Sequence, residues 1–171
     1  FFNVEGMIRA LDIYQGRPLI NYVSGERWAL ARVLPMLKRH PVPVVVQPVG
    51  DMGIPLTAAA RMEIVLRVAD ALEPVGIDPQ DIYVDGLTPA LGMLPCPLEV
   101  SVETIAAAKE AGFRTILWPA NAGLGYPDGE IAAATYAAMA VRAGLDLAVV
   151  APTDRVLRAA IANANIILRK E

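Results

Sequence analysis

The sequence predicts an α/β fold built around a parallel sheet, and two features of the chain carry that prediction. Short apolar or β-branched runs recur along the chain, and each is followed by turn residues and then by a helical pattern. Within the helical patterns, apolar residues recur at spacings of three and four. This alternation is typical of βα units, in which each helix returns the chain so that the next strand runs parallel to the last. The predicted strands cover residues 18–21, 42–47, 82–85, 115–118 and 147–151.

Helical patterns stand before the first predicted strand and after each of the five, which makes six predicted helices. The first three helices have the clearest apolar faces. These faces are Val4, Met7, Ile8 and Leu11; then Leu30, Val33, Leu34 and Leu37; then Val65, Val68, Ala69 and Leu72. Residues whose side-chain oxygen can accept from free backbone amides mark the expected helix starts, and they are Asn3, Ser24, Thr57, Ser101 and Thr153.

Glycines mark where three of the helices are expected to end. Gly76, Gly112 and Gly144 stand where a left-handed residue closes a helix before the next strand. Residues 86–100 begin with several glycines and prolines and show no clear period, so they predict a long loop after the strand at 82–85. Long loops on this face of a βα array usually belong to the ligand site.

Composition restricts the classes of function. The chain has 171 residues, 55% of them hydrophobic, and a formal net charge of −3, which fits one compact domain without a basic surface for nucleic acid or membrane. The one cysteine, Cys96, excludes an internal disulfide and multi-cysteine metal sites, and the one histidine, His40, makes Ser-His-Asp catalysis very improbable. No apolar run approaches the roughly 20 residues of a membrane span. We therefore expect a cytoplasmic protein.

The chain ends also carry expectations. It begins at Phe1, and no charged segment precedes an apolar one, so we expect no signal peptide and a chain that starts partway through a larger protein. Five strands cannot close an eight-stranded barrel and would leave two open edges. The fold is therefore either an open doubly wound sheet or a sheet whose first strands lie outside this sequence.

Polar side chains end three of the predicted strands: Asn21, Asp85 and, just after the fourth strand, Asn121. Parallel strands bring their carboxyl ends to one face, so these three side chains could converge on a single ligand. A carboxylate such as Asp85 can accept two parallel N–H bonds from a flat amidine-like edge, whereas its structural alternative is a cap or a surface ion pair. The amide of Asn21 can donate and accept at a heterocycle edge, or simply bond the next turn.

Further candidates lie near these strand ends. Gly123 and Gly125 follow Asn121 and allow a ligand to approach the backbone closely, although the spacing is neither a dinucleotide fingerprint nor a phosphate-binding loop. Asp51 is another acid after a strand, where it more often caps a turn. His40, before Pro41, is expected at a helix C-terminus in a surface role, and Cys96 is expected to be a passive loop residue.

Taken together, five motifs resemble those of a known family, in order and with similar spacing. The motifs are Ile20-Asn21-Tyr22-Val23-Ser24-Gly25; Gly53-Ile54-Pro55 with Arg61; Ile82-Tyr83-Val84-Asp85-Gly86-Leu87; Asn121-Ala122-Gly123-Leu124-Gly125-Tyr126-Pro127; and Ala143-Gly144-Leu145-Asp146. They resemble the pterin-binding methyltransferases, that is, the methyltetrahydrofolate:corrinoid methyltransferases, which are related to dihydropteroate synthase. The resemblance covers essentially the whole chain.

This resemblance implies a TIM (β/α)8 barrel of which the chain supplies the last five strands, so that residues 1–171 form the C-terminal part of one pterin-binding domain. Phe1, Phe2 and Asn3 would then lie at or just after the third barrel strand. A pterin-holding aspartate of that strand would lie outside this sequence.

The resemblance also implies site roles. Asn21 and Asp85 would bind the pyrimidine edge of the pterin, and Asn121 would be the catalytic residue that reaches the ring near N5. Asp51 and Gly123 complete the expected substrate-binding set, and no metal-ligating residue is expected.

The implied activity moves the N5-methyl group of a methyl-tetrahydropterin, such as methyltetrahydrofolate, to the cobalt of a corrinoid carried by a partner protein. A homodimer is also an option, because family members are often dimers. Two alternatives stay open. One is a non-catalytic barrel subunit of a corrinoid complex, favoured because Gly129 and Ala133 replace polar residues of many relatives. The other, less favoured, is a dihydropteroate synthase, since residues 118–127 contain no Lys or Arg.

Overall fold

The computed structural model describes residues 3–91 and 98–169, which form a mixed α/β protein. Its strands make one parallel sheet in which the spatial order is the same as the order along the chain. The strands of this part of the chain are β1 (Ile20–Ser24), β2 (Val44–Gln47), β3 (Ile82–Asp85), β4 (Arg114–Leu117) and β5 (Leu147–Ala148). The predicted α/β class with a parallel sheet is confirmed.

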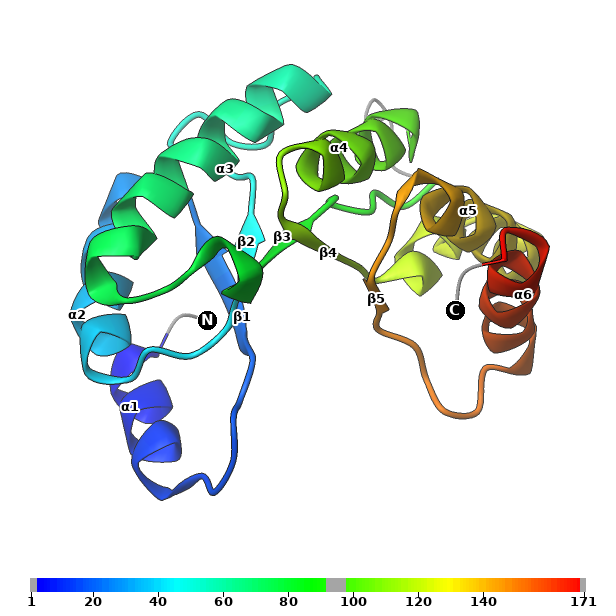
Figure 1. Ribbon diagram of the computed structural model, residues 1–171. Helices are drawn as coiled ribbons and strands as arrows, with labels where there is room; N and C mark the ends of the chain where they lie inside the picture. Colours follow the sequence, from blue (N-terminus) through cyan, green and yellow to red (C-terminus); the bar gives the residue numbers. More distant parts are fainter. Residues whose placement is uncertain (1–2, 92–97, 170–171) are drawn as a thin grey trace.

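Six helices accompany these strands in the described residues. They are α1 (Val4–Ile13), α2 (Arg27–Arg39), α3 (Ala58–Leu72), α4 (Leu98–Glu110), α5 (Gly129–Ala143) and α6 (Arg155–Ile167). Short 3₁₀ helices lie at η1 (Glu73–Val75), η2 (Pro79–Asp81) and η3 (Pro119–Gly123). Each α-helix contacts the next one, and Figure 1 shows the helices along the outer side of an open arch whose inner side carries the strands.

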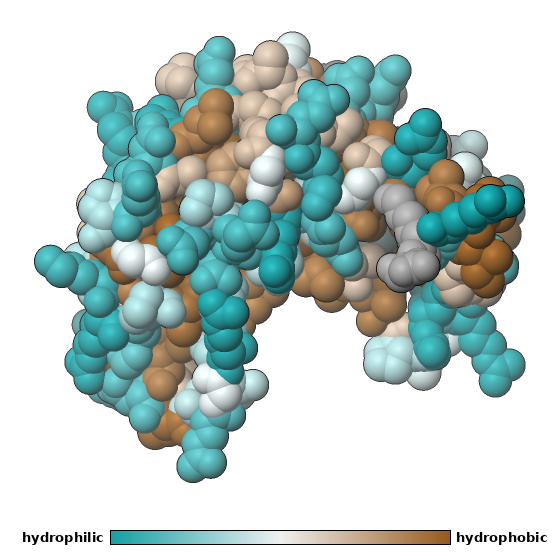
Figure 2. Space-filling view, viewed as in Figure 1, coloured by the Kyte–Doolittle hydropathy of each residue, from teal (hydrophilic) through white to brown (hydrophobic). Residues whose placement is uncertain are grey.

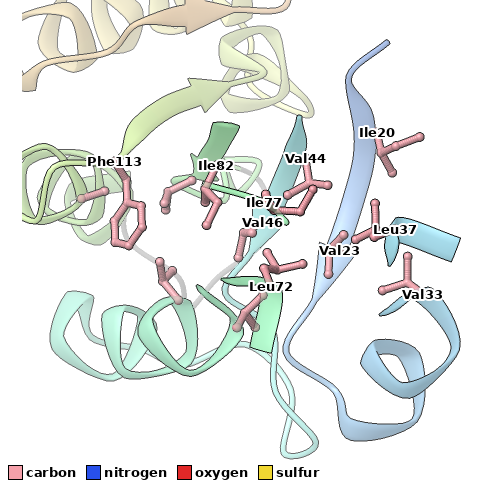
Figure 3. Close-up of a cluster of buried hydrophobic side chains, with 14 of the residues drawn as sticks. Ile20, Val23, Val33, Leu37, Val44, Val46, Leu72, Ile77, Ile82 and Phe113 are labelled. Atoms are coloured by element: carbon pink, nitrogen blue, oxygen red, sulfur yellow. The ribbon is translucent and has the colours of Figure 1, made fainter. Parts of the chain in front are cut away.

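The main hydrophobic core lies between the sheet and the helices α2 and α3. Val44 and Val46 of β2 and Ile82 of β3 are buried there against Leu37 and Leu72 (Figure 3). Alternate strand residues thus point into the helix layer, as the pleat of a strand requires. Their neighbours Gln47 and Asp85 lie on the other face of the sheet.

Apolar surface is also visible along the inner side of the arch (Figure 2). The outermost strands of the described sheet, β1 and β5, contribute to exposed apolar surface: Leu19, just before β1, is 38% exposed, Leu147 is 40% and Val149 is 42%. No described helix is both long enough and apolar enough to cross a membrane.

The predicted strand bounds shift by a few residues, and proline explains two of the four shifts. The strand expected at 42–47 begins at Val44, since Pro41 and Pro43 cannot donate to the ladder. The strand expected at 18–21 runs instead from Ile20 to Ser24, and its pairing with β2 is irregular between Asn21 and Val23. The strand expected at 115–118 is shifted to Arg114–Leu117 because Pro119 begins η3. The strand expected at 147–151 ends at Ala148, although the Val149 amide still donates to the Leu117 carbonyl at 2.8 Å.

Two of the five predicted N-caps are confirmed. The Asn3 side chain accepts from the Gly6 amide at 2.9 Å, and Thr57 accepts from the Ala60 amide at 3.2 Å. The other three predictions are wrong, for different reasons. Ser24 is still part of β1, and Glu26 takes the cap position of α2.

Ser101 lies inside α4, which begins at Leu98, and its hydroxyl bonds Tyr136 instead. Thr153 stands one residue too early, because the Asp154 carboxylate caps α6 by accepting from the Leu157 amide at 2.9 Å. The early start of α4 also shortens the loop predicted at 86–100. Cys96, like Phe1 and Phe2, lies outside the described residues.

Gly76, Gly112 and Gly144 have left-handed φ angles of 89°, 86° and 112°, as predicted, which residues with a Cβ disfavour. Gly144 caps α5, whereas Gly76 caps η1, the 3₁₀ turn that follows the end of α3 at Leu72, and Gly112 lies two residues after α4. His40 is the C-cap residue of α2, as expected, and its Nε2 lies 3.2 Å from Asp12 Oδ1.

Candidate functional site

A pocket of about 570 Å³ lies at the carboxyl edge of the sheet. It is lined by Asn21 and Tyr22 of β1, by the last residues of β2 and β3, and by the segments that follow β2, β3 and β4. Asn21, Asp85 and Asn121, which lie far apart in the sequence, all line this one pocket. The parallel topology explains the convergence, since it gathers the carboxyl ends of the strands on one face.

Asp85 is the buried acid of the pocket. It is the last residue of β3, and only 4% of its surface is exposed. Its Oδ1 accepts from the Leu87 amide at 2.8 Å and its Oδ2 accepts from Gln47 Nε2 at 3.1 Å. Burial raises the pKa of the Asp85 carboxyl to about 6, although the bonds from Leu87 and Gln47 and the charge of Arg61 oppose that shift. A carboxylate offers about four acceptor positions, so two remain for a ligand.

Arg61 holds together the loops that frame the pocket. This α3 residue is fully buried, with Nε donating to the Pro55 carbonyl at 3.0 Å and Nη1 donating to the Gly86 carbonyl at 2.7 Å. The guanidinium thereby links the loop after β2 to the loop after β3. It also lines the pocket beside Asp85. Arg61 belongs to one of the five sequence motifs, but no role was predicted for it.

Two amides complete the polar lining on the β1 and β2 side. Gln47, at the end of β2, bonds Asp85 as described, and Asn21 of β1 is exposed toward the pocket it lines. Asn21 and Tyr22 are joined by a cis peptide bond. The side-chain amide of Asn21 makes no hydrogen bond to the described residues, so it can meet a ligand's donors and acceptors.

The loop after β3 is held by a hydroxyl chain at the side of the pocket. Thr88 lines the pocket, and its Oγ1 lies 3.3 Å from the Tyr136 hydroxyl of α5. That hydroxyl lies 2.6 Å from Ser101 Oγ in α4. Burial raises the pKa of Tyr136, so the phenol stays protonated and keeps its donor. Further along, the Leu91 amide donates to the Ala122 carbonyl at 3.1 Å, which joins this loop to η3.

Asn121 is presented by η3. The Asn121 amide donates to the Trp118 carbonyl at 3.1 Å, while its own carbonyl accepts from the Leu124 amide at 3.1 Å. Within the described part of the chain, the side chain makes no hydrogen bond and is exposed at the pocket. Its backbone is thus fixed, whereas its amide group is available to a ligand.

Asp51 and Gly123, also expected at the site, are not among the described residues that line the pocket. Asp51 instead binds the start of α2: its Oδ2 lies 2.6 Å from Arg27 Nε and its Oδ1 accepts from the Arg27 amide at 3.0 Å. These contacts with Arg27, the backbone bond first among them, lower the pKa of Asp51. Gly123 lies against Gly129, and a Cβ on either glycine would overlap the carbonyl of the other.

Gly123→Ala is therefore expected to destabilise the protein by about 1–3 kcal/mol, because the added methyl has only backbone to displace. Urea unfolding would measure the loss. Gly6→Ala serves as the control, since the nearest atoms to its Cβ belong to the Asn3 side chain at 3.3 Å and alanine favours a helix by up to about 1 kcal/mol. Equal stabilities for the two variants would contradict the close approach of Gly123 to Gly129.

The fold and the pocket define a class: an α/β protein with a pocket at the carboxyl edge of a parallel sheet, lined by a buried acid. No protein-family model matches this sequence.

Proposed function

We propose that this protein is a methyltransferase that binds a methyl-tetrahydropterin and passes its N5-methyl group to a corrinoid carried by a partner protein. The observation that carries the proposal is the convergence of Asp85, Asn21 and Asn121 on one pocket. The resemblance of the sequence motifs supports the same assignment. At about 570 Å³, the pocket also falls within the range of about 300–1,000 Å³ that small-molecule sites occupy.

The buried carboxylate suits the pyrimidine edge of a pterin. That edge presents a ring N–H next to an exocyclic amine, and these two donors match the acceptor positions that Asp85 keeps after bonding Leu87 and Gln47. The Asn21 amide can bond neighbouring ring atoms as donor and acceptor. Binding of two donors would also offset the cost of keeping Asp85 ionised in a buried place.

Asn121 is assigned the catalytic role. When the methyl group leaves, the bond between its carbon and N5 breaks, both electrons stay on N5, and N5 takes up one proton. The Asn121 side chain can hold this new N–H through its carbonyl oxygen, a bond that the methylated ring cannot make. A hydrogen bond that strengthens only as the methyl leaves lowers the barrier selectively. The partner's corrinoid supplies the cobalt nucleophile that accepts the methyl group.

A partner protein has apolar surface to meet at the pocket. Ile54 and Leu56 line the pocket and are 52% and 60% exposed, and Met52 in the same loop is fully exposed. Exposed apolar residues at a pocket mouth favour contact with another macromolecule over permanent exposure to water. This arrangement suits a reaction in which a carrier protein must approach the bound ligand.

The fold proposal follows the same resemblance: the five strands belong to a (β/α)8 barrel of which this chain supplies the last five. Supporting it are the sequential order of parallel strands and the helices along one side of the sheet (Figure 1). The outer strands β1 and β5 and the apolar inner side of the arch would then be covered by further strands of the same barrel.

The first test is calorimetric titration of the full-length protein with methyltetrahydrofolate, beside Asn121→Ala and Asn163→Ala. Asn163 is an exposed residue of α6 and does not line this pocket, so its variant controls for the loss of an amide. We expect Asn121→Ala to change the dissociation constant less than about fivefold but to slow methyl transfer to free cob(I)alamin by about a hundredfold. Failure of the unaltered protein to bind the ligand would reject the proposal.

A non-catalytic subunit of a corrinoid complex is the second candidate. The observation in its favour is that Gly129 packs against Gly123 and Ala133 is 4% exposed, so neither supplies a polar group to the pocket. Binding without any transfer would favour this candidate. A dihydropteroate synthase is less favoured, since no lysine lines the described pocket and its arginine, Arg61, already bonds two carbonyls.

A further inference from the structure

Trp118 is the largest side chain of the pocket, and the proposed chemistry does not use it. It directly follows β4, is half-buried and lines the pocket with Asp85 and Asn121. Its indole N–H makes no hydrogen bond to the described residues. A large aromatic side chain that lines a pocket, and whose N–H is not bonded by the described residues, suggests a role in ligand binding.

The sheet register places Trp118 beside Asp85. Asp85 of β3 is paired with Ile116 of β4, so Trp118, two residues further on, continues on the same side of the sheet. Trp118 stands just past the end of β4, at the carboxyl edge of the sheet where Asp85 ends β3, and both residues line the pocket.

The other neighbour of β3 also contributes apolar residues to the pocket. β3 lies between β2 and β4 in the sheet, and the loop after β2 brings Ile54 and Leu56 to the pocket. β3, which carries Asp85, thus lies between the strand that leads to Trp118 and the strand whose loop carries Ile54 and Leu56. A pocket with a buried acceptor and apolar side chains contributed from both neighbouring strands suits a flat molecule bound by its edge.

We propose that Trp118 stacks on the face of a flat, conjugated heterocycle whose donor edge is bound by Asp85, and that this contact selects the ligand class. The proposal rests on the proposed ligand site and names a determinant within it. Aromatic faces attract one another in offset stacks, and the contact excludes water from both rings. Because stacking depends on a planar π face rather than on volume, an aliphatic side chain of similar size is not an equivalent replacement.

Tryptophan fluorescence gives a direct test, because the chain holds just two tryptophans, Trp28 and Trp118. Trp28 is 54% exposed, bonds Glu26 and does not line the pocket. In Trp28→Phe, emission therefore comes from Trp118 alone, and we expect methyltetrahydrofolate to quench it along a saturating curve. In Trp118→Phe the same titration should show no saturable quenching. Free tryptophan titrated in parallel corrects for absorption by the ligand.

Affinity separates stacking from space filling. By calorimetry, Trp118→Phe should keep the dissociation constant within about threefold, whereas Trp118→Leu should raise it about tenfold, the size expected for a lost stacking contact. Circular dichroism confirms that each variant is folded. Binding by Trp118→Leu with unchanged affinity, or binding to Trp28→Phe without quenching, would overturn the stacking role and leave the proposed function standing. No binding by the unaltered protein would overturn both.

Discussion

Asp85→Asn is expected to make the protein more stable at neutral pH while it weakens ligand binding about a hundredfold or more. The folded protein keeps a carboxylate that is 4% exposed, and burial raises the pKa of that group from 3.8 to about 6. The ionised form is therefore disfavoured in the folded state. Residues with strongly shifted pKa values cluster at functional sites, so a buried carboxylate that lowers the stability of the fold indicates a role in binding.

The pH dependence follows from these two pKa values. Below about pH 4, Asp85 is protonated in both the folded and the unfolded state and contributes no difference. Between about pH 4 and 6 the unfolded chain releases the proton first, so the free energy of unfolding falls as the pH rises. Above pH 6 the cost is constant at about 3 kcal/mol, since one pKa unit corresponds to about 1.4 kcal/mol.

Asparagine removes this ionisation. Its side-chain oxygen can still accept from Leu87, and the Gln47 amide can turn over so that its oxygen faces the new NH₂ group. We expect Asp85→Asn to be about 1–3 kcal/mol more stable than the unaltered protein at pH 7 and nearly equal at pH 4. Urea unfolding at intervals from pH 4 to 7 measures the difference.

Asp70→Asn, an exposed position on α3, controls for the loss of one negative charge. If Asp85→Asn were less stable than the unaltered protein at pH 7, or if the difference in their free energies of unfolding did not change with pH, the prediction that Asp85 is ionised and buried in the folded protein would be disproved.

In calorimetry the same variant should weaken binding of methyltetrahydrofolate about a hundredfold or more, because two charge-assisted hydrogen bonds are lost. The unaltered protein should bind more weakly as the pH falls below about 6, since protonation of Asp85 removes an acceptor.

Asp85 and Asn121 were predictable as pocket residues because each follows an apolar run, and the alternation of strands and helices implies that the carboxyl ends of the strands meet. Asn21 also lines the pocket, but not as a strand end: the strand predicted at 18–21 runs on to Ser24, and Asn21 is its second residue. Gln47 carries the same signal at the end of its run and could have been found in the same way. The role of Asp51 was not predictable, because its contact with Arg27 depends on how the loop after β2 folds back to α2.

Arg61 and Trp118 show where sequence patterns stop being informative. A charged residue in the middle of a helical pattern is normally solvated, and only the positions of the two loops around α3 bury Arg61. Trp118 ends an apolar run and has the pattern of a core residue, yet it lines the pocket. Both assignments depend on contacts between segments that are distant in the sequence.

Arg61→Met is expected to cause the largest loss of stability among the substitutions considered, about 3–5 kcal/mol. It would leave the carbonyls of Pro55 and Gly86 without the donors that now lie at 3.0 and 2.7 Å. Buried acceptors without partners cost about 1–3 kcal/mol each. Urea unfolding of Arg67→Met gives the control: Arg67, on the same helix, is exposed and donates to one carbonyl, that of the buried Gly25, at 2.9 Å, so its loss should cost about 1–3 kcal/mol, less than the loss of Arg61.

The same substitution should change binding through Asp85, because the positive charge of Arg61 lowers the pKa of that carboxyl. Without it, the pKa of Asp85 rises further, and the pH below which binding weakens moves upward. Arg61→Lys separates the two effects. Lysine keeps the charge but lacks the planar fork, so it should preserve the pH profile of binding while it recovers only part of the stability. A profile that is the same in Arg61→Met as in the unaltered protein would mean that Arg61 acts on the pocket solely by holding its two loops.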